Sequence, residues 1–463
     1  MKAIVRPALA LITLLLATSA SGAQTPPASP FQDGSRVVAV GDSITNAGLY
    51  QGYVYLYHLT RFPERQIDIF NAGISGDTAQ GASDRYGWDI EPLDGNAASV
   101  MFGMNDVSGS DLYPADGQGA DIEAKRLQRV DAYEANMRAL VKRLMDDGID
   151  PILLTPSPYD DTSTMEAANQ PGRNAVLAEC GRRVEAIAAE NGLVVVDFNT
   201  PMTELNQRLQ QDDPAFTLVG KDRVHPGESG HLVMAYLYLK GLNAPADVAR
   251  VSLDARTGAV ADEYRCAVSN VKRSADSLSF DYLAEGIPFP VSDGARPALD
   301  WIPFTDELNR EMLTITDLPK GSYRLSIDGK AITTLTAAEL GAGVNLTAYP
   351  DTPQNQQAKQ VQSLYNAKYR SPIAKLRAIA FVEHACCRGM PHPLTLQQVE
   401  PKLENWVASA RGKPYQGYFR KCADEYKLNK PQQLSLMEQA EQALPAIRAA
   451  AQPRQHQISV TRI

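Results

Sequence analysis

The chain has 463 residues, of which 44% are hydrophobic and 21% charged, and its formal net charge is −9. This length predicts two or three domains, and the composition excludes a globally disordered chain. The acidic balance, without blocks of like charge or a zinc-finger spacing, argues against a nucleic acid as partner.

The first 23 residues have the pattern of a signal peptide. Lys2 and Arg6 precede an apolar run over 8–17, and Ser21-Gly22-Ala23 offers a small-x-small cleavage site. The run is short for a membrane span, and no other stretch reaches about 18 apolar residues. We therefore expect an exported protein, periplasmic or secreted, without stable membrane insertion. Residues 24–35 read as a Pro/Ser/Gly-rich linker, and an uncleaved anchor is the alternative.

From residue 36 to about residue 245 the pattern alternates between strand and helix. Strands are expected at Arg36–Val40, Gln66–Phe70, Ala98–Phe102, Pro151–Thr155 and Leu193–Asp197. Helices are expected at Gly48–Phe62, Ser83–Glu91, Ala124–Met145, Asn174–Asn191 and Gly230–Lys240. Alternation of this kind with continuously apolar strands predicts an α/β fold, a parallel sheet between two helical layers. Five strands in a flavodoxin-like order are the expected arrangement.

The pattern changes after Pro245. Short alternating runs over 246–350 predict a small β-sandwich-like domain, in which Leu313–Thr316 and Tyr323–Ile327 are expected to pair as a hairpin. Residues 351–455 are helical in pattern, and 456–463 alternate again. We expect this last segment to return to the β-domain as a strand.

The chain contains five cysteines, an odd number. Cys180 lies in a helical run and is interpreted as a buried thiol, whereas Cys266, Cys386, Cys387 and Cys422 belong to the second half. A disulfide from Cys422 to one of the vicinal pair is compatible with export, but spacing does not fix the connectivity. No metal-ligand spacing is present.

The stretch Val37–Thr45 is the first that indicates chemistry. Its apolar start predicts a buried strand that stops at Gly41, and Asp42-Ser43 follows at the entry to a helical pattern. A serine at such a turn exposes its hydroxyl near a helix N-terminus, which favours a developing negative charge. Ser43 is therefore a candidate nucleophile, although Gly-Asp-Ser on its own is also an ordinary turn.

Two further strand ends carry groups suited to acyl transfer. Residues 71–78 (Asn-Ala-Gly-Ile-Ser-Gly-Asp-Thr) contain glycines that let a backbone N–H approach a ligand. Residues 103–106 (Gly-Met-Asn-Asp) supply an asparagine amide. In an open parallel sheet such carboxyl ends meet at one edge, where ligands bind. Asp77 and Asp106 are expected to hold these loops in shape through backbone hydrogen bonds.

Asp222 and His225 lie on one predicted loop further along the chain. An aspartate three residues before a histidine can hydrogen-bond the imidazole, fix its tautomer and stabilise the imidazolium. No other histidine has an aspartate at this offset. Glu228 and His231 are interpreted as a helix-start carboxylate and a solvated histidine.

These four pieces, in this order, resemble the SGNH (GDSL) hydrolase family over most of residues 36–240. The matching residues are Gly41-Asp42-Ser43, Gly76, Gly103-Met104-Asn105-Asp106 and Asp222-x-x-His225. Each motif is weak alone, but their order and their places on the predicted elements make the set specific. The resemblance implies an α/β/α SGNH hydrolase domain, in a secreted bacterial member with C-terminal accessory regions.

The resemblance also implies roles for these residues. Ser43 would be the nucleophile, His225 the general base and then acid, and Asp222 the group that orients His225. The Ser43 N–H, the Gly76 N–H and the Asn105 amide would form the oxyanion hole. The implied reaction is ester hydrolysis through an acyl-enzyme, without metal or cofactor.

The substrate is less well defined by the sequence. Candidate substrate contacts are Tyr50, Trp88 and Tyr159, with Trp88 more typical of a packed helix face, and the stretch 107–121 could form a site rim or lid. A small-molecule or polysaccharide ester is expected, and the first choice is an acetyl ester of a carbohydrate. A lipolytic or general carboxylesterase is the alternative, and a carbohydrate-binding protein with an inactive hydrolase domain is a third hypothesis.

Overall fold

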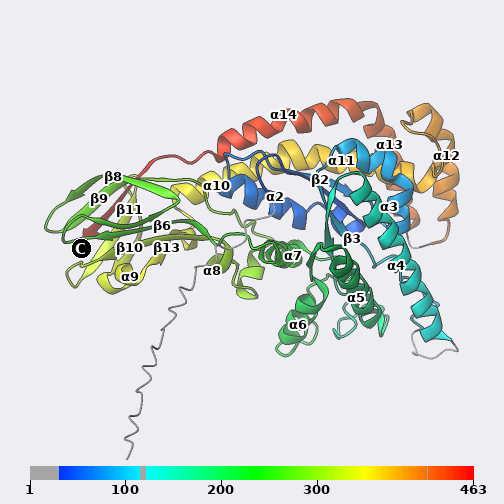
Figure 1. Ribbon diagram of the computed structural model, residues 1–463, viewed down its shortest axis with the longest axis horizontal. Helices are drawn as coiled ribbons and strands as arrows, with labels where there is room; N and C mark the ends of the chain where they lie inside the picture. Colours follow the sequence, from blue (N-terminus) through cyan, green and yellow to red (C-terminus); the bar gives the residue numbers. More distant parts are fainter. Residues whose placement is uncertain (1–30, 115–120, 414) are drawn as a thin grey trace, which may run out of the picture.

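A computed structural model gives the structure of the protein and describes residues 31–114, 121–413 and 415–463 (Figure 1). The predicted signal peptide and residues 24–30 of the predicted linker lie outside the described residues. Within the described ranges, no helix has the length and apolarity needed to cross a bilayer.

The first half of the chain forms a five-stranded parallel sheet. Its strand order, β2-β1-β3-β4-β5, is the flavodoxin-like order that the strand–helix alternation predicts. The strands are β1 (Arg36–Gly41), β2 (Asp68–Gly73), β3 (Ala97–Met101), β4 (Asp150–Leu154) and β5 (Val194–Val196). The predicted α/β fold class is therefore confirmed.

Both faces of this sheet are buried because its strands are apolar on both sides. In β1, Val37 packs into one core cluster, whereas Val38 and Val40 pack into the other. Side chains alternate across a strand, so consecutive valines fill opposite layers.

Helices form the two outer layers. Helices α2 (Tyr50–Arg61), α6 (Asn199–Gln210) and α7 (Glu228–Gly241) share the first cluster, and α3 (Ala79–Arg85), α4 (Ile122–Asp146) and α5 (Arg173–Asn191) share the second. A short helix, α1 (Ser43–Asn46), follows β1 directly. Helix α6 was not among the expected helices, because only two of its buried residues, Met202 and Leu205, are apolar.

The next part of the chain forms two packed sheets at one end of the molecule (Figure 1). The first sheet has the order β13-β10-β6-β7, and the second has the order β12-β11-β14-β9-β8. Their strands are β6 (Asp247–Asp254), β7 (Val260–Tyr264), β8 (Cys266–Arg273), β9 (Ser277–Ala284), β10 (Arg310–Thr316), β11 (Ser322–Ile327), β12 (Lys330–Thr336), β13 (Val344–Asn345) and β14 (His456–Arg462).

The expected hairpin between Leu313–Thr316 and Tyr323–Ile327 is wrong. Strand β10 pairs in parallel with β6, and β11 pairs with β12 and β14 in the other sheet. Both β10 and β11 bury alternate side chains in the core between the sheets. The chain therefore crosses that core between them, and the turn at Asp328-Gly329 closes a hairpin of β11 with β12.

The C-terminal helices pack along the parallel-sheet half of the molecule. Their bounds are α10 (Pro353–Leu364), α11 (Ser371–Cys386), α12 (Leu396–Ser409), α13 (Gln416–Asn429) and α14 (Gln433–Ala451). Two shorter helices, α8 (Phe304–Leu308) and α9 (Ala337–Ala342), come earlier in the chain, and α9 packs against β10 and β12 of the two-sheet domain. Helices α10 and α11 run away from the two-sheet domain over the parallel sheet, and α14 packs against both of them (Figure 1). Strand β14 follows α14 and pairs with β9 and β11.

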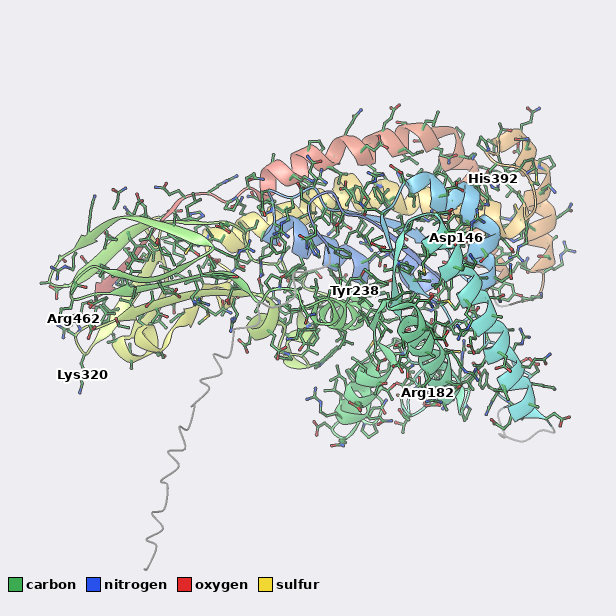
Figure 2. All side chains as sticks on the ribbon, in the orientation of Figure 1. Asp146, Arg182, Tyr238, Lys320, His392 and Arg462 are labelled. Atoms are coloured by element: carbon green, nitrogen blue, oxygen red, sulfur yellow. The ribbon has the colours of Figure 1, made fainter. Side chains whose placement is uncertain are left out.

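Figure 2 places Tyr238 of α7 in the middle of the molecule and His392 at the end remote from Lys320 and Arg462. Tyr238 belongs to a core cluster that also includes residues of α2, α10 and α14. The parallel-sheet domain and the C-terminal helices thus share one apolar core.

The structure does not form the disulfide considered for Cys422. All five cysteines are free thiols in the described residues. The Sγ atoms of Cys386 and Cys387 lie 3.2 Å apart, and Cys422 interacts with Tyr418 on its own helix. The thiols of this region therefore contact other side chains and are not joined by a disulfide.

Candidate active site

The register of the parallel sheet brings three loops together at one edge. Gly41 lies opposite Gly73 of β2 on one side and opposite Met101 of β3 on the other. The residues that follow these three strand ends are those singled out in the sequence: Ser43, Gly76 and Asn105. Parallel pairing thus places them around a common point.

Ser43 begins the short helix α1. The Asp42 side chain caps this helix, because its Oδ1 accepts a hydrogen bond from the Ile44 N–H at 3.0 Å. The cap holds the turn between strand and helix, so the Ser43 hydroxyl is directed away from the sheet.

The Ser43 hydroxyl meets the imidazole of His225. Ser43 Oγ lies 2.7 Å from His225 Nε2, and His225 Nδ1 lies 2.5 Å from Asp222 Oδ2. Asp222 Oδ1 also accepts the His225 backbone N–H at 2.9 Å. With Nδ1–H donating to Asp222, Nε2 is left to accept the serine proton.

The loop that carries Asp222 and His225 is fixed by Arg223. This residue has a positive φ of 65°, and its buried guanidinium turns away from the site. The guanidinium donates to four backbone carbonyl groups of the neighbouring loop, those of Asp160, Ser163, Met165 and Ala167. The loop after β4 therefore anchors the histidine loop.

The electrostatics of the Asp222–His225 pair suit a general base. Partial burial works to raise the pKa of Asp222, but hydrogen bonds from His225 outweigh it and lower that pKa to about 2. The hydrogen bond with Asp222 raises the pKa of His225 above its ordinary value, against the opposing effect of burial. Asp222 is thus ionised at neutral pH and stabilises the imidazolium.

Asn105 joins the two loops that flank Ser43. Its Nδ2 donates to the Asp77 carbonyl oxygen at 2.9 Å and lies 3.5 Å from Asp42 Oδ2. Gly76, the neighbour of Asp77, has a φ of 76°, which glycine adopts without strain. The Asn105 amide therefore links Asp42, which precedes Ser43, to Asp77, which follows Gly76.

Other buried groups hold these loops. Asp106 accepts the backbone N–H groups of Ala79 and Gly103 at 3.0 Å each, as the sequence predicts. Arg173 of α5 donates to the Met104 carbonyl at 2.7 Å, a contact that the sequence analysis missed. Burial raises the pKa of Asp42 to about 7 and that of Asp106 to about 6.

Two of the candidate substrate contacts turn inward. Tyr50 is fully buried, with its hydroxyl 3.0 Å from Thr45 Oγ1. Tyr159 is also buried, and its hydroxyl accepts the Gln170 N–H at 3.0 Å. Both rings therefore support loops and leave no face for a bound molecule.

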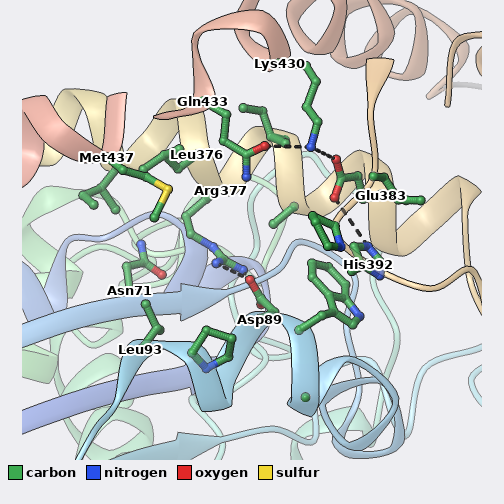
Figure 3. A pocket seen from close by; sticks show the side chains of 18 residues that line it. Asn71, Asp89, Leu93, Leu376, Arg377, Glu383, His392, Lys430, Gln433 and Met437 are labelled. Atoms are coloured by element: carbon green, nitrogen blue, oxygen red, sulfur yellow. Dashed lines mark hydrogen bonds and ion pairs between the residues drawn. The ribbon is translucent and has the colours of Figure 1, made fainter. Parts of the chain in front are cut away.

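Trp88, the third candidate, lines a cavity of about 470 Å³ between the parallel-sheet domain and the C-terminal helices. The side chain lies on a π-helical turn, Tyr86–Ile90, and stacks on His392 with ring centroids 3.9 Å apart. Figure 3 shows this cavity with Leu376 and Met437 on its walls. Ser43 and His225 do not belong to its lining.

The interpretation of His231 as a solvated histidine is wrong. His231 is buried, and its ring lies parallel to that of Tyr50 at a centroid distance of 6.2 Å. Burial lowers its pKa to about 3, so it is neutral in the folded protein. One helical turn from Glu228, it is packed against Tyr50 of α2 and withdrawn from solvent.

Part of the predicted rim, residues 115–120, lies outside the described residues. Before it, Leu112 and Tyr113 are buried in the second core cluster. In the ranges that the structure describes, no group of three or more His, Cys, Asp or Glu side chains could hold a metal ion.

Comparison with known proteins identifies the family. The model of the GDSL-like lipase/acylhydrolase family matches residues 39–233. An acetylxylan esterase of Geobacillus stearothermophilus is 30% identical over 226 residues, which cover 45% of this chain and 93% of that protein. The chain belongs to the GDSL-like lipase/acylhydrolase family. This GDSL-family protein is an ester hydrolase.

A solved structure is similar over nearly the whole chain. It is described as a gut microbial diltiazem-metabolizing enzyme, is 30% identical and has a TM-score of 0.83. The similarity covers 94% of this chain and 99% of the other. The two-sheet domain and the C-terminal helices of the GDSL-family protein are therefore shared with that enzyme.

Sequence reasoning missed the contacts that C-terminal residues make with the Gly76 loop, defined here as residues 73–78. Asp77 was expected to hold its loop through backbone hydrogen bonds, but its carboxylate binds Arg85 and His384 instead. A signal was present in the sequence: Arg377, Glu383 and His384 are charged or polar residues in the otherwise apolar stretch 376–386 of α11. Such residues are buried only with partners.

The Asp222–His225 hydrogen bond makes a spectroscopic prediction. Replacing Asp222 with Asn removes the negative charge that holds the proton on the imidazole, so the His225 pKa should fall towards or below its ordinary value. An NMR titration of the imidazole signals would measure this shift. An unchanged pKa in D222N would contradict the pairing, and Asp328→Asn, beside His456, is the matched control.

Proposed function

We propose that the protein is a serine esterase that acts through an acyl-enzyme, with Ser43, His225 and Asp222 as its catalytic residues. The observation that carries this proposal is the pair of short contacts from Ser43 Oγ to His225 Nε2 and from His225 Nδ1 to Asp222. In that order a hydroxyl, an imidazole and a carboxylate form a nucleophile, a base and an orienting group.

The reaction follows from this order. Ser43 Oγ attacks the ester carbonyl carbon while its proton passes to His225 Nε2, and Asp222 stabilises the imidazolium. The carbonyl oxygen becomes an oxyanion, for which the N–H groups of Ser43 and Gly76 and the Asn105 amide are the proposed donors. Collapse of the intermediate breaks the bond to the alcohol, which leaves with the proton from His225.

Water completes the cycle. A water molecule gives a proton to His225 Nε2 and attacks the acyl carbon. The second intermediate then releases the carboxylic acid, and the proton returns to Ser43 Oγ. The side chains of Asp222 and His225 are about half exposed, so water has access to this step.

The catalytic assignment predicts graded losses of activity on p-nitrophenyl acetate. Ser43→Ala and His225→Ala should abolish turnover, because they remove the nucleophile and the general base. Asn105→Ala should lower kcat by about 10²–10³-fold, the usual effect of losing one oxyanion donor. Near-native activity in S43A would refute the assignment, and His231→Gln, a buried histidine beside the site, controls for effects on packing.

For the substrate, we propose an acetyl ester of a carbohydrate. The similarity to an acetylxylan esterase, over nearly the full length of that protein, supports this choice. The open setting of Ser43 and His225 supports it too, since a polysaccharide chain has to reach the serine from solvent.

A second candidate is an ester of a small aromatic drug-like molecule. It is favoured by the similarity, over nearly the whole chain, to the diltiazem-metabolizing enzyme. The diltiazem-metabolizing enzyme shares the C-terminal regions, whereas the acetylxylan esterase match covers about half of this chain. The names of the two relatives favour different alcohol parts of the ester.

A substrate panel would separate the two candidates. We expect p-nitrophenyl acetate to be cleaved faster than longer-chain esters, and acetylated xylo-oligosaccharides to release acetate with a higher kcat/KM than diltiazem. Release measured with the wild type and with S43A would assign the turnover to this site. Preference for long acyl chains would instead favour a lipolytic enzyme, and binding of glycans without any hydrolysis would favour an inactive hydrolase domain.

We also propose that the protein is exported, on the strength of Lys2, Arg6 and the apolar run that follows them. Expressed in a Gram-negative host, the full chain should appear in the periplasm or medium with a mass that corresponds to cleavage after Ala23. A chain without residues 2–23 should stay in the cytoplasm. Recovery of the uncleaved chain in membranes would favour the anchor instead.

A further inference from the structure

We propose that the C-terminal helices complete the active site by fixing the Gly76 loop, with Arg377 and His384 of α11 as positioning residues for the oxyanion hole. This inference rests on the proposed function, which assigns an oxyanion donor to Gly76. It extends the active site beyond residues 39–233, the part that matches the family model.

Arg377 holds the start of the loop. Its Nε donates to the Gly73 carbonyl oxygen at 3.0 Å, and its two terminal nitrogens donate to the Asp89 carboxylate at 2.7 Å each. Figure 3 shows the Arg377–Asp89 pair on the wall of the cavity between the two regions. The planar guanidinium thus fixes Gly73 relative to Asp89 in two directions.

His384 holds the other end of the loop. Its Nε2 lies 3.1 Å from Asp77 Oδ1, and Arg85 Nε donates to Asp77 Oδ2 at 2.8 Å. Arg85 also contacts Asp89 at 2.5 Å. Arg377 and His384 are about two helical turns apart on α11, so the network leaves that helix, passes through the catalytic domain and returns to it.

Between these ends, further C-terminal residues contact the loop. Ile74 is fully buried in a cluster with Ile379 and Val382 of α11. The side chain of Ser75 interacts with Tyr418 of α13 and accepts a hydrogen bond from Asn46 at 2.9 Å. Residues on both sides of Gly76 are therefore held from the C-terminal helices.

Asp77 and His384 approach each other beside the backbone of Gly81. A Cβ at Gly81 would lie 1.8 Å from Asp77 Oδ1 and 3.1 Å from His384 Nε2. The absence of a side chain at this position permits the close approach of the histidine to the carboxylate.

Asp77 connects this network to the proposed donors. Its carbonyl oxygen accepts the hydrogen bond of the Asn105 amide, and its N–H follows Gly76 in the chain. A displacement of the Asp77 side chain would therefore move the Gly76 and Asn105 donors together. A misplacement of about 1 Å can cost about 10²-fold in rate.

The chemistry of the network favours positioning over stability. The charged side chains of Arg85, Asp77, Asp89 and Arg377 are almost completely withdrawn from solvent. Buried ion pairs of this kind are a poor source of net stability but hold groups in one geometry. Buried charges that add little stability are expected where the positions of the groups they hold matter for the reaction.

The test is a substitution series at His384. His384→Ala should lower kcat on p-nitrophenyl acetate by about 10–100-fold with KM little changed, because the donors act on the oxyanion more than on the bound ester. His384→Gln, which can still donate to Asp77, should recover most of the loss. His456→Ala removes a buried histidine of the two-sheet domain that is paired with a half-exposed aspartate, Asp328, and should leave kcat unchanged.

A double-mutant cycle with Asn105→Ala separates positioning from a general loss of structure. If His384 acts through the donors, the two losses should be clearly less than additive. Full additivity, a loss carried by KM alone, or a loss no larger than that of H456A would overturn the inference. If H384A does not fold, Arg377→Lys in the same cycle gives the answer, since it keeps the charge but cannot bridge Gly73 and Asp89.

Failure of the proposed function would look different. If the proposed function fails, S43A keeps its activity. If only the positioning inference fails, the wild type shows turnover that depends on Ser43 but does not respond to substitution of His384 or Arg377.

Discussion

The hydrogen bond between Ser43 and His225 joins two residues that lie 182 positions apart, and the rest of the site is arranged around it. Two structural features set the distance between Ser43 Oγ and His225 Nε2. The register of β1 sets the height of Ser43 at the sheet edge, and the Arg223 guanidinium ties the histidine loop to the carbonyl groups of residues 160–167. Neither feature takes part in proton transfer. Both keep a donor and an acceptor at bonding distance without help from a bound substrate, which is the condition for a preorganised site.

Local patterns predicted the catalytic half of the molecule well because its order follows from short-range rules. Alternating strands and helices imply the layers, and the ends of parallel strands imply where Ser43, Gly76 and Asn105 meet. The same reasoning failed for β10 and β11, since a hairpin and a crossing between sheets begin with the same alternating residues. It also had no means to place Arg377 beside Asp89, a pair separated by 288 positions. Contacts of that kind depend on how whole regions pack.

Two kinds of contact attach the C-terminal helices to the catalytic domain. Their apolar residues enter the core that includes α2 and α7, and their charged residues reach the Gly76 loop from α11. The apolar contacts have no preferred direction, whereas the ion pairs with Asp77 and Asp89 have fixed directions. The region is thus held to the catalytic domain by one kind of contact and oriented by the other. A relative of similar length shares this architecture.

Strand β14 has a consequence for the order in which the protein assembles. It lies between β9 and β11, so the second sheet of the two-sheet domain lacks its middle strand until residues 456–462 arrive. During synthesis, the parallel sheet can form from residues that emerge early, but β9 and β11 must wait for most of the remaining chain. Their unpaired edges are meanwhile open to other strands, which is a known route to aggregation. The two-sheet domain, unlike the parallel sheet, therefore stays incomplete until residues 456–462 have been made.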